Sequence, residues 1–175
     1  MKQELLIGCG TSREKKLAKE GDKFEFGEGL ITLDINPDRK PDVIWDLNNL
    51  PLPFEDSIFD EIHAYHVLEH LGSQGDYKQF FGFFEELWRI SKHMGYFLGI
   101  VPHWKSHWVY GDPSHTRLVH PYQFNFLSQK YMKNEVERGS QASDFRYMYK
   151  GNWEAVKVFP SDDEENTYII LAAIK

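Results

Sequence analysis

Five short apolar segments follow one another in the first part of the chain, and polar or amphipathic stretches separate them. These segments are residues 4–7, 30–35, 42–45, 59–65 and 96–101. Apolar runs of this length, bounded by turn residues, are typical of buried strands. Strands that alternate with helices form a mostly parallel sheet, because each connection returns along a face of the sheet. The sequence therefore predicts an α/β protein with a doubly wound sheet and helices on both faces.

Three helices are expected between and after these strands. The first covers residues 12–20, where Ser12 can cap the N-terminus. The second covers residues 77–93, because apolar residues recur there with helical spacing until Gly95 interrupts them. The third is expected over residues 122–132.

The end of the chain has a different pattern. Residues 153–159 and 167–174 read as strands, and the charged stretch 161–166 joins them as a hairpin loop, which predicts an antiparallel C-terminal pair. A chain of 175 residues is long enough for one core. We therefore predict a single domain over residues 1–175, with an insertion or lid at about 103–152 on the ligand side.

Composition excludes several classes of protein. The formal net charge of −7 disfavours binding to nucleic-acid phosphates. Cys9 is the only cysteine, which excludes an internal disulfide and argues against a cysteine-based zinc site. No apolar run is long enough to cross a membrane, and the run before Cys9 is too short for a lipoprotein signal. We expect a cytoplasmic protein.

Two glycines follow the first predicted strand directly, and Cys9 lies between them. A bend at Gly8 and Gly10 lets backbone amides approach a ligand, and the helix expected after it would add its positive end. Asp34 ends the second predicted strand. In an open α/β sheet its carboxylate lies beside the first bend, where it can accept hydrogen bonds from ribose hydroxyls. A full dinucleotide fingerprint needs a further glycine where Arg13 stands, and the plainer role for Asp34 is to cap the turn that follows.

A more specific signal lies in residues 42–71, which read DVIWDLNNLPLPFEDSIFDEIHAYHVLEHL. The residues that carry this signal are the pairs and triplets Asp46-Leu47, Leu52-Pro53-Phe54, Glu55-Asp56, Phe59-Asp60 and Leu68-Glu69-His70. Their order and spacing match those of a known protein family. Through them the chain resembles the S-adenosylmethionine-dependent methyltransferases with the seven-stranded Rossmann-like fold, in particular the methyltransferase type 11-like branch. The resemblance covers about residues 4–102, and the C-terminal pair fits the family's last two strands.

The resemblance implies S-adenosylmethionine as cofactor and a set of residues that would bind it: Gly8, Cys9, Gly10, Asp34, Ile35, Asp46, Leu47 and His66. The glycine bend would approach the methionine part of the cofactor. Asp34 would hold the ribose and Ile35 would lie against the adenine. Asp46 would accept from the adenine amine, the Leu47 backbone would contact the ring, and His66 would border the methionine part and face the substrate.

The sequence also departs from the family pattern. Leu6 stands where the family commonly has an acidic residue, and Ser12 where it usually has a glycine. The helices after the second and third strands look shortened. These departures keep a second hypothesis open, a non-catalytic S-adenosylmethionine-binding module of the same fold. A nicotinamide-dependent oxidoreductase is a lesser alternative, against which Arg13 and the 46–70 segment count.

A histidine-rich stretch, PHWKSHWVYGDPSHTRLVHPYQF, follows the fifth predicted strand. It allows three interpretations. His115, or His66 before it, removes a proton from the acceptor, which makes these two the candidate catalytic residues. Alternatively, His103 and His107 bind a metal together with Asp112 or His115, as in a metal-dependent hydrolase. We favour the third interpretation, in which most of these histidines pack within an aromatic lid, and we predict no metal site.

The sequence thus predicts a methyltransferase that acts on an oxygen or nitrogen atom of a small-molecule acceptor. Methyl transfer needs mainly in-line positioning of the nucleophile and the sulfonium, so it does not depend on a base. The fourth strand is not followed by the Asp-Pro-Pro-Tyr or Asn-Pro-Pro-Tyr motif of amino-methylating DNA enzymes. Together with the negative charge, this argues against a nucleic-acid partner.

Overall fold

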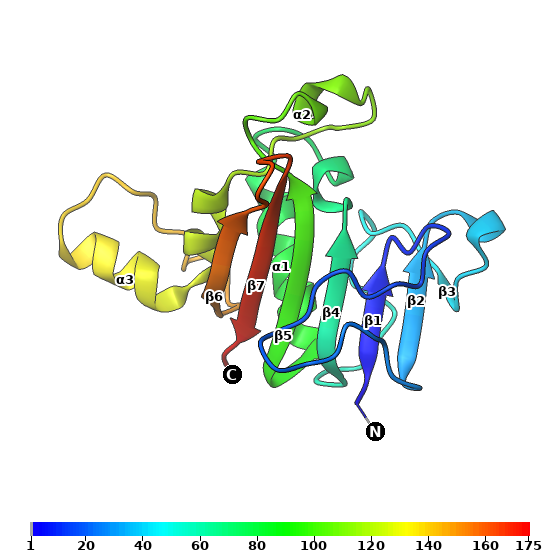
Figure 1. Cartoon of the computed structure of the whole chain (residues 1–175). Coiled ribbons are helices and arrows are strands. Elements are labelled where there is room, and N and C mark those ends of the chain that lie inside the picture. Colours follow the sequence, from blue (N-terminus) through cyan, green and yellow to red (C-terminus); the bar gives the residue numbers. More distant parts are fainter. Residues whose placement is uncertain (1) are drawn as a thin grey trace.

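A seven-stranded sheet forms the centre of the computed structural model, which describes residues 2–175 (Figure 1). In sheet order the strands are β3 (Val43–Ile44), β2 (Leu30–Asp34), β1 (Glu4–Ile7), β4 (Phe59–Tyr65), β5 (Ser91–Pro102), β7 (Asn166–Ala173) and β6 (Trp153–Pro160). β7 runs antiparallel to both of its neighbours, and the other paired strands of the described chain are parallel. The predicted α/β sheet, mostly parallel with an antiparallel C-terminal hairpin, is confirmed.

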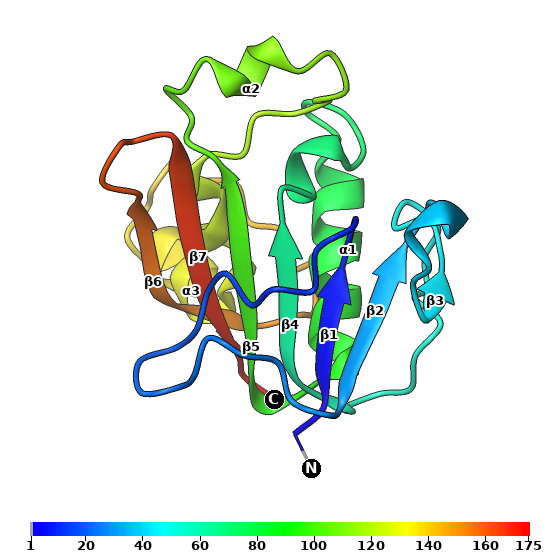
Figure 2. The same cartoon turned by 45° about the vertical axis from the view of Figure 1, so that its right-hand side comes forward.

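The strand order reverses between β1 and β4. From β1 the chain moves outward to β2 and β3, and then returns to place β4 on the other side of β1. In open α/β sheets a ligand binds outside the carboxyl ends of the strands at such a switch point. Figure 2 shows these carboxyl ends at one edge of the sheet, where the bend after β1 lies beside the end of β2.

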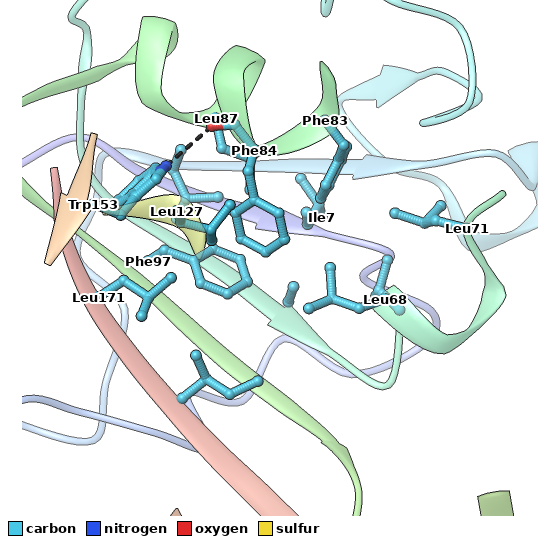
Figure 3. Close-up of a cluster of buried hydrophobic side chains, with 14 of the residues drawn as sticks. Ile7, Leu68, Leu71, Phe83, Phe84, Leu87, Phe97, Leu127, Trp153 and Leu171 are labelled. Carbon is cyan, nitrogen blue, oxygen red and sulfur yellow. Dashed lines mark hydrogen bonds between the residues drawn. The ribbon is translucent and has the colours of Figure 1, made fainter. Parts of the chain in front are cut away.

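Helices cover one face of the sheet. α1 (Tyr77–Ile90) begins at Asp76, whose side chain accepts a hydrogen bond from the Gln79 amide at 3.0 Å. Its buried face packs Phe84 and Leu87 onto the main core (Figure 3). The indole nitrogen of Trp153 on β6 donates to the Phe84 carbonyl at 3.0 Å, which joins the far strand to this helix.

The second face carries no helix within the described residues, so the expectation of helices on both faces is met on one face only. The helix predicted over residues 12–20 is wrong, because residues 11–29 cross this face as an irregular segment (Figures 1 and 2). Leu17 and Phe26 are its main apolar contacts with the sheet. A short helix needs an apolar stripe to be stable, and this polar stretch does not supply one.

Buried polar contacts hold the 11–29 segment in place. The Lys15 ammonium donates to Glu4 Oε1 at 2.6 Å and to Glu61 Oε2 at 2.7 Å, and all three side chains are almost fully buried. The hydroxyl of Tyr65 accepts from the backbone amides of residues 16 and 17. Glu4 Oε2 accepts from the Gly27 amide at 2.7 Å. Two amides that a helix over residues 12–20 would use internally are thus bonded to the Tyr65 side chain on β4.

Two other predicted helices have different bounds. α1 ends at Ile90 rather than at 93, because Ser91 already pairs with Phe59 as the first residue of β5. Gly95 therefore lies within a strand and breaks no helix. The helix expected over 122–132 is divided into a 3-10 helix, η3 (Pro121–Leu127), and α3 (Gln129–Glu137), because the Ser128 side chain caps the Tyr131 amide and starts α3 anew.

The segment predicted as a lid has two parts with different positions. Residues 103–120, with the short helix α2 (Trp108–Gly111), pass above the carboxyl edge of the sheet (Figures 1 and 2). In the second part, Phe124, Leu127 and Met132 of η3 and α3 pack into the main core beside α1. Two short 3-10 helices complete the edge, η1 (Pro37–Arg39) after β2 and η2 (Leu68–His70) after β4. None of the helices in residues 2–175 has the length and apolar character needed to cross a membrane.

Candidate functional site

The bend after β1 requires glycine at its first position. Gly8 and Gly10 have φ angles of 59° and 52°, in the left-handed region that glycine adopts most easily. A Cβ atom on Gly8 would also overlap Cγ2 of Val67, whereas one on Gly10 would meet no atom within 4 Å. Gly8 is therefore constrained by space as well as by conformation, and its bare backbone faces the end of β4.

Asp34 faces this bend. Its Oδ2 accepts from the Gly10 amide at 2.8 Å, and its Oδ1 accepts from the Asn36 amide at 2.9 Å. The carboxylate thus joins the bend to the end of β2 and caps the turn that follows, which is the plainer role considered from the sequence; its role toward a ribose stays a prediction. A carboxylate has about four acceptor positions, so each oxygen keeps one for a ligand.

A cavity of about 360 Å³ opens beside Gly8 and Asp34. This volume lies in the range of small-ligand sites. Predicted residues that line it are Gly8, Asp34, Ile35, Asp46, Leu47 and His66, and the other lining residues are Leu33, Trp45, Asn48, Val67, His70 and Leu71. The hollow at the switch point is therefore open, and residues from four separate segments meet in it.

Cys9 and Gly10 lie outside the lining of this cavity. The Cys9 side chain points into the core of the second face, where it is 5% exposed and packs with Leu17 and Tyr65. Burial raises the pKa of the Cys9 thiol. Gly10 acts through its amide, which holds the Asp34 carboxylate. The structure thus brings six of the eight predicted cofactor residues to one cavity and gives these two indirect positions.

The far end of the cavity has an apolar surface and a second carboxylate. Ile35 is 62% exposed at its mouth, although it is a large apolar residue. Oδ1 of Asp46 accepts from the backbone and side-chain nitrogens of Asn48 at 2.9 and 3.1 Å. This leaves Oδ2 of Asp46 for a ligand beside the buried Leu47. An exposed aliphatic side chain and a carboxylate that line the same cavity suit a flat heterocycle with an amine.

His66 stands between this cavity and a second one. It has a left-handed φ of 58°, and its amide donates to the Ile100 carbonyl at 2.7 Å. The second cavity, of about 330 Å³, is lined by His66, His70, Pro102, Trp108, Asp112, His115, Glu165 and Asn166. Both cavities share His66 and His70 as a common wall. A small molecule in the second cavity would therefore lie next to a ligand in the first.

Of the histidines that follow β5, only His115 reaches the common wall in the described chain. Its ring lies 4.7 Å from that of His70, centroid to centroid. His103 is buried and accepts from the Lys105 amide at 3.4 Å, while His107 is largely exposed. His120 caps the Tyr122 amide at 3.2 Å. Within residues 2–175, neither His103 nor His107 therefore belongs to a group of three possible metal ligands.

Sequence reasoning gave no role to Trp45, Asn48 and His70, which line these cavities, or to Glu69, which is next to His70 in the sequence. Trp45 and Asn48 flank the predicted Asp46-Leu47 pair, and Glu69 and His70 belong to the Leu-Glu-His triplet. The usable signal was a carboxylate next to a histidine at the end of a buried strand. It became interpretable only when the fold placed His115 beside it.

Comparisons with known proteins agree with the topology. No protein-family model matches the chain, and no curated protein matches it either. Solved structures match over nearly its full length. A SAM-dependent methyltransferase from Archaeoglobus fulgidus is 20% identical, with a TM-score of 0.59, and the match covers 98% of this chain and 86% of that one.

Two further structures are similar at lower identity. The N-methyltransferase NodS from Bradyrhizobium japonicum, in complex with S-adenosyl-l-homocysteine, is 12% identical with a TM-score of 0.57, over 99% of this chain and 79% of that one. An S-adenosylmethionine-dependent methyltransferase from Clostridium acetobutylicum is 11% identical with a TM-score of 0.58, over 99% and 85%. At these identities the comparison shows the fold. The chain therefore has the Rossmann-like α/β fold found in S-adenosylmethionine-dependent methyltransferases.

Proposed function

We propose that the chain is an S-adenosylmethionine-dependent methyltransferase that acts on an oxygen or nitrogen atom of a small-molecule acceptor. The observation that carries the proposal is the open cavity in which Gly8, Asp34 and Asp46 meet, with His66 and His70 separating it from a second cavity. The fold shared with methyltransferases supports the same cofactor. A cytoplasmic location and the lack of a nucleic-acid partner stay predictions from the sequence.

In this proposal each wall of the first cavity binds one part of the cofactor. Asp34 accepts from the ribose hydroxyls through its two remaining acceptor positions. Asp46 and Ile35 hold the adenine by a hydrogen bond and an apolar contact. The backbone at Gly8 lies next to the methionine part, because Gly8 lines the cavity and has no side chain of its own. Carboxylates and carbonyls also suit a cationic sulfonium.

S-adenosylmethionine held there would supply a methyl group on a sulfonium; a lone pair of the acceptor would bond to this carbon while the carbon–sulfur electron pair moved to sulfur. The second cavity holds the acceptor, so that its nucleophilic atom faces the common wall. His66 and His115 are the candidates to take up the proton that the acceptor loses. Most of the rate enhancement in this scheme comes from alignment of the two reactants across the wall.

A non-catalytic binding module is the second candidate. It is favoured by the irregular segment after the bend, because the ligand then lacks the positive end of a helix. Methyl transfer from radiolabelled S-adenosylmethionine to a panel of small hydroxyl and amine compounds separates the two. Labelled product supports the enzyme, whereas tight binding without any labelled product across the panel supports the binding module.

Calorimetry with S-adenosylhomocysteine tests the cofactor site. We expect binding by the wild type and a loss of about 1–2 kcal/mol, roughly five- to thirtyfold in Kd, in Asp34→Asn, which removes the charge and keeps the shape. Asp38→Asn is the matched control, because Asp38 is exposed on the same loop. Binding of a nicotinamide dinucleotide in place of S-adenosylhomocysteine would refute the proposal.

A further inference from the structure

Glu69 is a buried carboxylate that has no hydrogen-bond partner. The residue is 2% exposed, and neither of its side-chain oxygens is hydrogen-bonded. The His66 ring is in contact with it, with Nδ1 3.3 Å from Oε1, but that side chain is 45% exposed. A buried carboxylate is costly unless it is paired or binds a metal ion. Among the described residues, this carboxylate next to His70 thus has no lysine or arginine partner.

Two imidazoles converge on this carboxylate. Ligand atoms of Glu69, His70 and His115 all lie within 4.8 Å of one another. Nδ1 of His115 is buried and has no partner, and the side chain is 8% exposed. The three groups come from η2 and from the segment after α2, so the fold alone brings them together.

The surroundings orient the His70 ring as in metal sites. Nδ1 of His70 lies 3.2 Å from the Ser114 carbonyl, which fixes a proton there and leaves Nε2 with a lone pair. Nε2 of His115 lies 3.9 Å from Asp112 Oδ2, which is beyond hydrogen-bond distance, while its Nδ1 is the buried ring nitrogen. Metal-ligating histidines generally donate their other ring N–H to a carbonyl or carboxylate.

The backbone also holds the cluster together. The amides of Thr116 and Arg117 both donate to the Glu69 carbonyl, at 2.9 and 3.2 Å. His115 is therefore attached to η2 through its direct neighbour in sequence. Such a connection positions a ligand from the lid segment without the need for a regular element.

We infer that Glu69, His70 and His115 bind a divalent transition-metal ion. Two imidazoles and one carboxylate favour Zn²⁺, Mn²⁺ or Fe²⁺ over Mg²⁺ and Ca²⁺, which prefer oxygen ligands. Bonds of about 2.1 Å place tetrahedral ligands about 3.4 Å apart. The three ligand atoms, which lie within 4.8 Å of one another, would have to move closer to reach that distance. This inference replaces the sequence-based prediction of no metal site and uses a different set of ligands from the His103–His107 pair.

The ion would face the second cavity, because His70 and His115 line it. Resting on the proposed function, this specifies the acceptor further as a molecule whose nucleophile is an oxygen able to bind a divalent cation. Three protein ligands leave a coordination position open for such a group.

A second cluster of possible ligands does not compete for this role. Ligand atoms of Glu4, Glu61 and His63 also lie close together, but the Lys15 ammonium is bonded to both carboxylates. That cluster already has its cation. The two groups differ in that, among residues 2–175, only Glu69, His70 and His115 have no lysine or arginine bonded to their carboxylate.

The test uses the full chain, freed of metal with EDTA, and Co²⁺ as the probe. We expect one equivalent to bind by calorimetry and to give visible d–d absorption. In Glu69→Gln and in His115→Asn the affinity should fall at least about tenfold. His107→Gln should bind like the wild type, because His107 is exposed and outside the cluster. Circular dichroism checks that each variant is folded.

Three outcomes would overturn the inference: no binding of Co²⁺, equal binding by both cluster variants and the wild type, or an equal loss in His107→Gln. The proposed function is measured apart from it, by S-adenosylhomocysteine binding in the presence of EDTA. Binding of S-adenosylhomocysteine without Co²⁺ binding removes the metal site alone. Binding of Co²⁺ without S-adenosylhomocysteine removes the proposed cofactor and leaves the metal site.

Discussion

Gly8 and Gly10 share one backbone conformation but have different surroundings. Both have positive φ, yet only Gly8 is in contact with the end of β4, at Val67. Gly10 is open to its surroundings and serves through its amide. A side chain at Gly10 would therefore cost only backbone strain, whereas a side chain at Gly8 would cost backbone strain and a steric overlap.

Substitution by alanine should reveal this difference. Gly10→Ala should cost about 1–2 kcal/mol in the free energy of unfolding, the cost of a left-handed residue with a side chain. Gly8→Ala adds the overlap with Val67 and should cost at least about 1 kcal/mol more, with loss of S-adenosylhomocysteine binding. Urea unfolding and calorimetry measure both. Equal destabilisation by the two variants would contradict the crowding at Gly8.

Glu69 also has a stability signature that a purely structural residue would not show. Without metal, Glu69→Gln should be at least as stable as the wild type, because it removes an uncompensated buried charge. Co²⁺ at about 100 times the wild-type Kd should raise the wild-type free energy of unfolding by about 2.7 kcal/mol and that of a variant with tenfold weaker binding by about 1.4 kcal/mol, or less if its binding is weaker still. Urea unfolding with and without Co²⁺ decides. If Glu69→Gln is strongly destabilised without metal, the charge is structural, through its contact with His66.

Residues next to each other in the motifs were predictable, and residues that meet through the fold were not. Gly8, Asp34 and Asp46 follow strands whose ends must share an edge, so their meeting follows from a parallel sheet. Glu69 and His115 meet because backbone amides of the lid segment bond to η2. The periodicity of apolar residues, which predicts helices and strands, does not predict such a contact.

Among the elements, the 11–29 segment departs most from the sequence-based prediction. Ser12 and the charged residues after it suit a helix, but local preference is a weak determinant when tertiary contacts oppose it. Here the buried Lys15 is bonded to Glu4 and Glu61, and the Tyr65 hydroxyl takes two backbone amides. A single lysine with two buried carboxylates is not visible as a pattern in one sequence. By contrast β4, with its continuous β-forming residues, was predicted with the bounds that the structure has.

Lys15 is therefore essential to the position of the 11–29 segment. Lys15→Met would leave the Glu4 and Glu61 carboxylates without their buried cation, and should lower the free energy of unfolding by about 3–5 kcal/mol. Lys16→Met is the control next to it, on an exposed side chain, and should change stability by less than about 0.5 kcal/mol. Urea unfolding compares them. A small effect of Lys15→Met would mean that the segment is held by Leu17 and Phe26 alone.

For the whole molecule, the same buried cluster sets the response to acid. Burial lowers the pKa of His63, whose Nδ1 lies 2.7 Å from the Tyr65 hydroxyl. Burial alone would raise the pKa of Glu61, but hydrogen bonds from His63, Lys15 and Lys2 outweigh it and hold that pKa well below its ordinary value. Both groups therefore bind fewer protons in the folded chain than in the unfolded chain.

Stability should fall in two steps as the pH is lowered. Below about pH 6.5 the unfolded chain protonates at His63 while the folded chain does not, and below about pH 4.5 the same holds for Glu61. Above these values both contributions are fully present. Urea unfolding between pH 8 and pH 4 measures the slope. His63→Gln should flatten it between pH 7 and pH 5, and an unchanged slope there would exclude His63 as its source.

The common wall of His66 and His70 ties the two cavities thermodynamically. A ligand in one cavity would restrict the motion of these imidazoles, so a ligand that then enters the other cavity would lose less conformational entropy on binding. Such coupling is reciprocal. If bound S-adenosylhomocysteine increases the affinity for Co²⁺ by some factor, bound Co²⁺ must increase the affinity for S-adenosylhomocysteine by the same factor. Each cavity would then bind its ligand more tightly when the other cavity is occupied.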